Sequence, residues 1–281
     1  MEGALYICAT PIGNLEDITL RVLKTLKEVD LIAAEDTRHS LRLLRHYDIK
    51  TPMTSYHKFN KVSKGPALIL KLKEGQNIAL ITDAGTPAIS DPGEDLVKLA
   101  YENGIRVYSL PGATACITAL TLSGLKTRRF AFESFLPSDN KQRIRILEEL
   151  QNESRTIILY EAPHRLLKTL GQLYEYLGDR NLTILRELTK KFEEVYQTSL
   201  KQAISKYENE EAKGEIVLVI EGKSWDIIDN ENQEAWSSLS VKEHMDFYEK
   251  QGINRKEAMK KVAKDRGVSK RDIYNELLKY K

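Results

Sequence analysis

The chain has few cysteines and no long apolar run. Its two cysteines, Cys8 and Cys116, are far apart and lie within apolar segments, which favours neither a disulfide framework nor a cysteine metal site. We therefore expect a reducing compartment, the cytoplasm. No apolar stretch reaches the roughly 20 residues of a membrane helix, and the start at Met1 does not resemble an export signal, so we expect no membrane association.

The whole chain also lacks a large net charge of either sign. The 43 Lys and Arg nearly balance 41 Asp and Glu, so total charge does not indicate a nucleic-acid-binding protein. With 281 residues, 41% of them hydrophobic, the chain is long enough for two ordinary domains. A disordered chain and a mini-protein are excluded.

Apolar runs of strand length alternate with helix-period segments through the first 222 residues. This alternation predicts an α/β fold built from parallel βα layers. A helix that ends at Gly124 predicts a boundary between domains at 1–124 and 125–222. Strands are expected over 5–10, 31–34, 78–82, 106–110, 130–135, 156–160, 183–188 and 215–220, with an antiparallel edge over 192–200; helices are expected over 20–29, 40–47, 94–103, 113–122, 141–150 and 164–176.

The last part of the chain differs in character. Residues 223–239 are acidic without a clear period and are expected to form a linker. Ser240, Asn254 and Ser269 each mark a helix start, which predicts a small all-helical module over 240–281 that resembles a helix-turn-helix. These residues hold 12 Lys and Arg against 7 Asp and Glu, a balance that suits phosphate contacts. A solubilising appendage or a dimer contact is the alternative.

Three loops that follow first-domain strands are rich in Pro, Gly and small side chains. They cover residues 9–19, 82–93 and 110–116. Open α/β sheets bind ligands at the carboxyl ends of their strands, and rigid loops there present backbone groups to a polar small molecule. The middle loop, with two Asp, two Gly and two Pro, favours a ligand site most strongly. Ordinary turns remain the alternative for the other two.

Six segments in order resemble the ribosomal RNA small subunit methyltransferase I family, which belongs to the tetrapyrrole methylase superfamily. They are TPIGNLEDIT at 10–19, AAEDTR at 33–38, DAGTPAISDPG at 83–93, LPGA at 110–113, YEAPHR at 160–165 and RELTK at 186–190. The resemblance implies two α/β domains with S-adenosylmethionine in the cleft between them. It also implies 2′-O-methylation of a cytidine in the decoding region of 16S rRNA, on the small ribosomal subunit, by a homodimer.

The resemblance implies that the three loops bind the methyl donor. Methyl transfer from a sulfonium is an in-line displacement, which requires alignment and exclusion of water rather than a metal. The expected donor-binding residues are Pro11, Gly13, Asp83, Ala84, Gly85, Thr86, Pro87, Ser90, Pro111, Gly112, Ala113 and Thr114.

A ribose hydroxyl is a weak nucleophile until a base or an oriented acceptor takes its proton. The candidate groups are Glu35, Asp36, His57, Glu161 and His164. For Glu35 and Asp36 the alternative is a helix N-cap beside a solvated Arg38, and a His at a helix start is more often structural.

Expected RNA contacts are Arg38, His57, Lys58 and Arg165. Residues 56–60 combine aromatic, His and Lys side chains, as binding of single-stranded RNA requires. Loop aromatics can equally anchor an irregular segment.

Two other functions remain open from the sequence. One is C-methylation of a corrin or porphyrin precursor, and the other is a non-enzymatic, ligand-sensing regulator that binds nucleic acid. The basic C-terminal module argues against the first, because a small anionic macrocycle needs no additional helical module. The second predicts tight binding of duplex DNA without methyl transfer.

Overall fold

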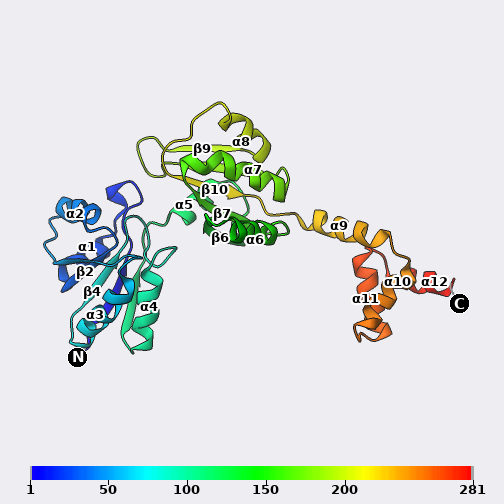
Figure 1. Cartoon of the computed structure of the whole chain (residues 1–281), viewed down its shortest axis with the longest axis horizontal. Helices are drawn as coiled ribbons and strands as arrows, with labels where there is room; N and C mark the ends of the chain where they lie inside the picture. Colours follow the sequence, from blue (N-terminus) through cyan, green and yellow to red (C-terminus); the bar gives the residue numbers. More distant parts are fainter. Residues whose placement is uncertain (1, 280–281) are drawn as a thin grey trace.

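The computed structural model describes residues 2–279, which form two α/β domains followed by four helices (Figure 1). The first domain contains a parallel sheet in the order β3-β2-β4-β1-β5. Its elements are β1 (Ala4–Cys8), η1 (Leu15–Asp17), α1 (Leu20–Glu28), β2 (Leu31–Ala34), α2 (Thr37–His46), β3 (Met53–Ser55), α3 (Lys61–Lys73), β4 (Ile78–Ile81), α4 (Gly93–Glu102), β5 (Arg106–Leu110) and α5 (Ala115–Leu122).

Each face of the first sheet has its own core, because alternate residues of a strand point to opposite faces. Leu5 and Leu80 pack with α3 and α4, whereas Cys8 and Ile81 pack with α1 and α2 (Figure 1). Coverage of both faces explains why these strands are continuous apolar runs. Since all the strands are parallel, the loops after β1, β4 and β5 leave the sheet at the same edge.

The second domain contains a mixed sheet in the order β6-β7-β10-β8-β9. Among its neighbouring strands only β6 and β7 pair in parallel, so the expectation of parallel layers is wrong here. A hairpin through residues 187–193 joins β8 to β9, which confirms the expected antiparallel edge. The elements are β6 (Phe130–Phe135), α6 (Asn140–Leu150), β7 (Thr156–Glu161), η2 (Pro163–Arg165), α7 (Leu166–Leu177), β8 (Asn181–Arg186), β9 (Glu194–Ser199), α8 (Leu200–Tyr207) and β10 (Ile216–Ile220).

Helix α5 connects the two domains. Helices α6, α7 and α8 cover one face of the second sheet, and the buried Cys116, Ala119 and Leu120 of α5 pack against the other face. A boundary at residue 124 therefore assigns α5 to the first domain by sequence, although the helix covers the sheet of the second.

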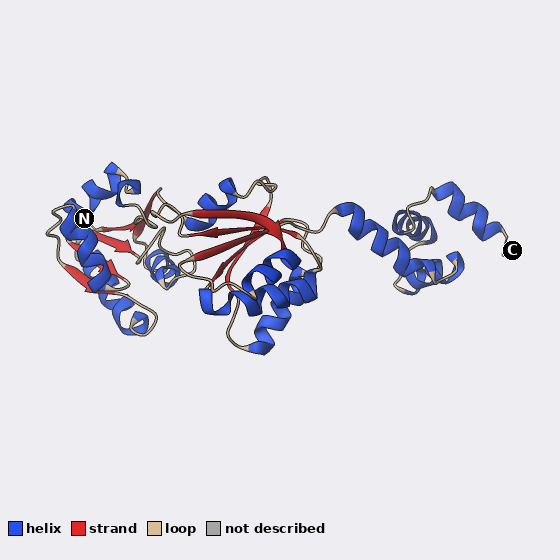
Figure 2. Ribbon diagram, turned by 90° about the horizontal axis from the view of Figure 1, so that it is seen from above, coloured by secondary structure: helices blue, strands red, loops and turns tan. Residues whose placement is uncertain are grey.

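The expected linker contains a helix. Residues 223–239 include α9 (Trp225–Ser237), and Ser224 caps this helix by accepting a hydrogen bond from the Ile227 N–H. Composition alone does not predict α9, because its stabilising contact comes from a later helix: the Trp236 ring stacks on His244 with ring centroids 3.7 Å apart. Beyond it lie α10 (Val241–Lys250), α11 (Arg255–Asp265) and α12 (Lys270–Leu278), at the end of the molecule opposite the N-terminus (Figure 2).

The three helices of the C-terminal module begin at the caps that the sequence predicts. Ser240 and Ser269 form reciprocal capping boxes with Glu243 and Asp272, and Asn254 accepts a hydrogen bond from the Glu257 N–H. Within residues 2–279, no helix has the length and hydropathy that crossing a membrane requires.

Candidate functional site

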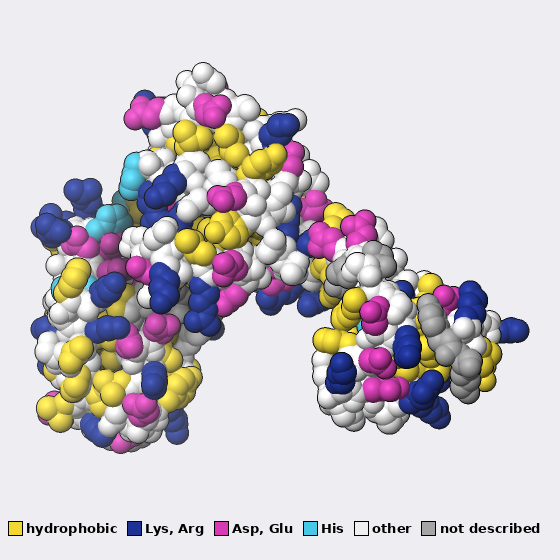
Figure 3. Space-filling model, turned by 45° about the vertical axis from the view of Figure 1, so that its right-hand side comes forward, with side chains coloured by type: hydrophobic (Ala, Val, Ile, Leu, Met, Phe, Trp, Pro, Cys, Tyr) yellow, Lys and Arg dark blue, Asp and Glu magenta, His cyan; other side chains and the backbone are white. Residues whose placement is uncertain are grey.

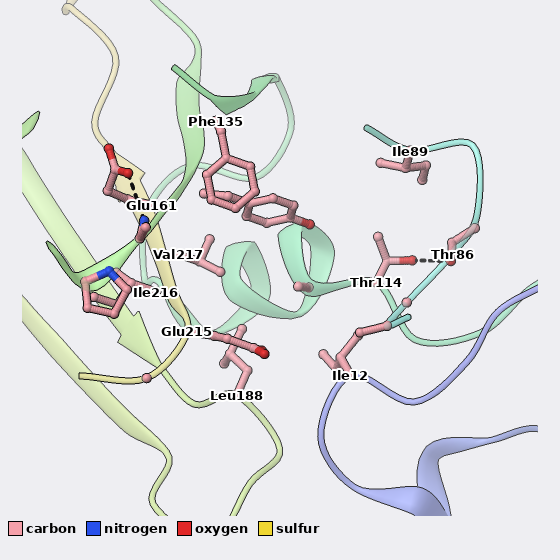
Figure 4. Close-up of a pocket in the computed structure, with 17 residues that line it drawn as sticks. Ile12, Thr86, Ile89, Thr114, Phe135, Glu161, Leu188, Glu215, Ile216 and Val217 are labelled. Carbon is pink, nitrogen blue, oxygen red and sulfur yellow. Dashed lines mark hydrogen bonds between the residues drawn. The ribbon is translucent and has the colours of Figure 1, made fainter. Parts of the chain in front are cut away.

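A cavity of about 390 Å³ lies where the two domains meet, and we call it the first cavity. In Figure 4, Ile12, Thr86 and Ile89 approach it from the first domain, opposite Phe135, Leu188 and Val217 of the second. Its lining is mostly apolar and includes residues from both domains. The complete set is Ile12, Ala84, Gly85, Thr86, Ile89, Thr114, Ala115, Phe135, Tyr160, Glu161, Ala162, Pro163, Leu188, Gly214, Glu215, Ile216 and Val217.

The three loops are hydrogen-bonded to one another at this edge of the first sheet. The Thr10 N–H donates to the Gly85 carbonyl at 2.9 Å, and the Gly85 N–H donates back to Thr10 at 3.1 Å. The Thr86 hydroxyl donates to the Ala113 carbonyl at 3.0 Å and lies 2.7 Å from the Thr114 hydroxyl, a contact visible in Figure 4. These bonds hold the first-domain side of the cavity in one arrangement.

The loop after β4 carries backbone strain. Ala88 and Ser90 have φ values of 67° and 69°, a region that costs a non-glycine residue on the order of 1 kcal/mol or more. The Asp91 carboxylate stabilises the turn by accepting hydrogen bonds from the Ala88 and Gly93 N–H groups at 3.0 and 2.7 Å. Burial nevertheless raises the pKa of Asp91 above its usual value.

In the loop after β1, position 13 requires glycine because the second domain approaches the backbone there. A Cβ atom there would lie 2.7 Å from the Leu188 carbonyl oxygen of the second domain. The neighbouring Asn14 N–H donates to the Thr189 hydroxyl at 3.0 Å across the same junction. The absence of a side chain at Gly13 therefore allows the second domain to approach closely.

Tyr160 and Phe135 form the aromatic part of the second-domain wall. Their rings meet edge to face with centroids 5.6 Å apart, and Phe135 is 52% exposed. The Tyr160 hydroxyl accepts a hydrogen bond from the Cys116 N–H at 3.1 Å, which ties the wall to the start of α5. Burial raises the pKa of Tyr160, so this phenol stays protonated near neutral pH.

A second cavity of about 550 Å³ adjoins the first and shares Ile12, Ala84 and Glu215 with it. It is more polar, with side chains of α2 on one side and the residue pair Lys190 and Glu215 on another. Its complete lining is Thr10, Pro11, Ile12, Gly13, Leu15, His39, Ser40, Arg42, Leu43, His46, Thr82, Asp83, Ala84, Lys190 and Glu215.

The residues predicted for donor binding divide between the cavities. Ala84, Gly85, Thr86 and Thr114 line the first cavity; Pro11, Gly13, Asp83 and again Ala84 line the second; Pro87, Ser90, Pro111, Gly112 and Ala113 line neither. Gly112 instead lies against the residue that follows β1. A Cβ atom added to Gly112 would lie 2.6 Å from the Cβ atom of Ala9.

Among the candidate bases, Glu161 borders the first cavity but is engaged within its own domain. Its carboxylate accepts hydrogen bonds from the Thr169 hydroxyl and from the Ala162 N–H, and lies 3.5 Å from Arg165 Nε. Only 1% of the side chain is exposed. In Figure 4 the carboxylate lies across the pocket from Thr86 and Thr114.

Asp36 is the N-cap of α2, the structural alternative considered for it. It accepts a hydrogen bond from the Arg38 N–H at 2.8 Å and pairs with the Arg38 guanidinium at 2.9 Å. This arrangement lowers the pKa of Asp36 to about 2. Glu35 accepts a 2.6 Å hydrogen bond from the Thr82 hydroxyl, so it supports the loop after β4. Neither carboxylate lines the two cavities.

The remaining predicted residues lie outside the linings of the two cavities. His57, His164, Arg38 and Lys58 are absent from both, and Arg165 donates to the Leu136 carbonyl at 2.8 Å. Residues that the sequence did not single out, including Ile12, Ile89, Phe135, Tyr160, Leu188 and 214–217, complete the first cavity. Tyr160 stands in the YEAPHR segment and Leu188 in the RELTK segment, and these two signals could have identified part of this wall.

Comparisons with known proteins identify the class of this fold. The family Tetrapyrrole (Corrin/Porphyrin) Methylases matches residues 4–204. Uroporphyrin-III-C-methyltransferase from Thermus thermophilus has a TM-score of 0.55 at 19% identity, with 79% of this chain and 93% of that chain covered. Cobalt precorrin-4 methyltransferase has a TM-score of 0.57 at 18% identity, with 77% and 94% covered. These structures establish a tetrapyrrole methylase fold.

Curated relatives are much more similar in sequence. Ribosomal RNA small subunit methyltransferase I of Halalkalibacterium halodurans is 50% identical over 275 residues, 98% of this chain and 94% of the relative. Its counterpart in Bacillus subtilis is 48% identical over 273 residues, 97% and 93% of the two chains. The chain therefore belongs to the ribosomal RNA small subunit methyltransferase I family, which confirms the resemblance carried by the six sequence segments.

Proposed function

We propose that this protein transfers a methyl group from S-adenosylmethionine to small-subunit ribosomal RNA. The acceptor is the ribose 2′-hydroxyl of a cytidine in the decoding region of 16S rRNA, and the substrate is the small ribosomal subunit. The 50% identity to ribosomal RNA small subunit methyltransferase I over 98% of the chain is the observation that carries this proposal. The resemblance also implies a homodimer, which light scattering of the purified protein tests.

The first cavity fits the methyl donor in chemistry and size. Its volume of about 390 Å³ is within the range of small-molecule sites. Phe135 and Tyr160 offer apolar faces to an adenine ring, and the Thr86 and Thr114 hydroxyls offer polar contacts. The Glu215 carboxylate borders the cavity and favours a nearby cation. When bound, the donor supplies a methyl group on a cationic sulfonium.

The adjoining cavities provide the alignment that an in-line displacement requires. Ile12 and Ala84 form walls common to both, so a donor in the first cavity and an acceptor in the second meet at these residues. Asp83 and Glu215 are the carboxylates lining the second cavity, and either one is placed to accept the hydroxyl proton. No group of His, Cys, Asp and Glu suited to a metal ion occurs within residues 2–279.

Methyl transfer to unmethylated small subunits tests the proposal. Labelled donor should produce an alkali-resistant linkage at one cytidine, because 2′-O-methylation removes the hydroxyl that alkaline cleavage uses. A methylated base would contradict ribose as the acceptor. Absence of transfer to subunits and to naked rRNA would contradict the proposed substrate class.

A further inference from the structure

One face of α2 presents cationic and polar side chains to the second cavity. His39, Arg42 and His46 are spaced i, i+3 and i+7 along the helix, so they lie on the same side and all border the cavity. Arg38 and Arg45 flank Arg42 at i−4 and i+3 along the helix, but neither is part of the lining. Histidine and basic side chains gather near the junction of the first and second domains in Figure 3.

Ser40, also in the lining, has an unsatisfied hydroxyl. The residue is 2% exposed, and its Oγ has no hydrogen-bond partner among the described residues. Buried hydroxyl groups are nearly always paired, because desolvation without a partner is unfavourable. Ser40 therefore brings an unused hydroxyl to the wall of the second cavity, where it is available to a polar ligand.

One cationic side chain of this lining, Arg42, is not engaged by a carboxylate of the described residues. Glu215 already pairs with Lys190 at 3.2 Å, and Asp83 accepts a hydrogen bond from the Asp36 N–H at 3.0 Å. Within residues 2–279, the Arg42 guanidinium has neither an ion pair nor a hydrogen-bond partner. An unpaired guanidinium near an unpaired hydroxyl suits a ligand that carries an anion and hydroxyl groups together.

We propose that the second cavity binds the sugar and phosphate of the nucleotide that is methylated, with Arg42 at the phosphate and Ser40 at the sugar. This assignment rests on the proposed function. It places the ribose beside Ile12 and Ala84, the walls that the second cavity shares with the first. The α2 face is thereby a positioning surface for the acceptor, and it contacts no part of the donor.

A matched pair of α2 variants tests the assignment in steady-state methylation of unmethylated small subunits. Arg42→Glu should raise KM for subunits at least tenfold, because a phosphate contact becomes a repulsion. Arg45→Glu makes the same change of charge on the same helix, at a residue outside the lining, and should alter KM by less than threefold. Calorimetric donor binding should be unchanged in both variants. Equal effects of the two variants on KM would overturn the proposal.

Ser40→Ala separates a binding role from a structural one. Removing an unpaired buried hydroxyl should leave Tm unchanged or raise it, yet KM for subunits should rise roughly threefold or more. An unchanged KM would contradict contact between Ser40 and the acceptor.

The wild-type protein distinguishes the failure of this assignment from failure of the proposed function. Transfer to subunits by the wild type together with equal KM values for Arg42→Glu and Arg45→Glu would remove only the cavity assignment. Transfer by the wild type to a tetrapyrrole such as uroporphyrinogen III, with none to subunits, would remove both.

Discussion

Glu161 borders the first cavity, but its contacts indicate that it supports the second domain. We expect Glu161→Ala to lower the free energy of unfolding by about 3 kcal/mol, because the variant leaves the half-buried Arg165 without its carboxylate and the buried Thr169 hydroxyl without its acceptor. Glu161→Gln keeps an oxygen acceptor, and its kcat should stay within tenfold of the wild type. Denaturant unfolding and single-turnover methylation measure the two effects. A large loss of kcat in a fully stable Glu161→Gln protein would identify Glu161 as the base.

Asp36 gives a pH dependence whose direction follows from its pKa. The pKa of about 2 lies below the ordinary 3.8, so the ionised group stabilises the fold above about pH 4, and this stabilisation is lost as pH falls from 4 towards 2. Arg38→Gln removes the guanidinium that mainly lowers this pKa, so the pKa of Asp36 should rise towards 3.8. An NMR titration of the carboxyl carbon checks this, and an unmoved pKa would show that the backbone hydrogen bonds suffice.

Gly85 is required by its conformation and by its place at the first cavity. Its φ is +86°, and an added Cβ would lie 3.3 Å from Ile12 Cγ2. Gly85→Val should therefore weaken donor binding at least tenfold by calorimetry. Gly104→Val is the matched control, since Gly104 has a φ of +73° with no atom within 4 Å of an added Cβ. Equal donor affinity in the two variants would separate Gly85 from the donor.

Sequence reasoning identified residues of the site where a loop carries an unusual composition. Pro and Gly in the loops after β1, β4 and β5 pointed to the edge of the sheet where Gly85, Thr86 and Thr114 line the first cavity. The opposite wall was missed, because apolar side chains such as Phe135 and Val217 have the same pattern as core residues. Gly13 showed that a required glycine does not by itself indicate a ligand.

Some of the helices and strands are predictable from the sequence, whereas others depend on tertiary pairing that the sequence pattern does not show. β2, β5 and β6 occupy the expected residues because each is a short segment between turn signals, although only β2 is a continuous apolar run. The apolar run of β10 does not encode the direction of its neighbours, so the antiparallel pairing was missed. β3 is only three residues long, and α3 contains Gly65 and Pro66, both of which weaken helix prediction.

The junction of α9 with α10 contains a titratable group that makes the C-terminal module sensitive to acid. Burial and the nearby Arg266 lower the pKa of His244 below 6.5, although Asp265 acts in the opposite direction; Trp236 and Tyr248 cover the ring. Because the folded module favours neutral His244, the contribution of the neutral imidazole to folding stability is complete above about pH 6.5 and decreases as pH falls. Hydrogen exchange of α9–α12 in the full chain should show easier opening at pH 5 than at pH 7. His244→Phe should remove this difference.

At the scale of the whole molecule, the excess of Lys and Arg over Asp and Glu lies in residues 240–281, at the end farthest from the first domain (Figure 1). Deleting residues 240–281 should weaken binding to small subunits about tenfold or more and reduce the salt dependence of binding, because phosphate contacts are lost. Donor affinity should be unchanged, since none of the described residues 240–279 lines the first cavity. Filter binding at several salt concentrations measures the effect, and unchanged affinity for subunits would favour a solubilising or dimer role for the module.

The placement of α5 limits how this protein can be divided into pieces. A fragment that starts at residue 125 would lack the helix that covers one side of its sheet and would expose Ile158, Val217 and Val219 to water. A split just before Thr114 keeps that helix with its sheet, but it also divides the lining of the first cavity between the fragments. Neither fragment alone can therefore form the complete first cavity.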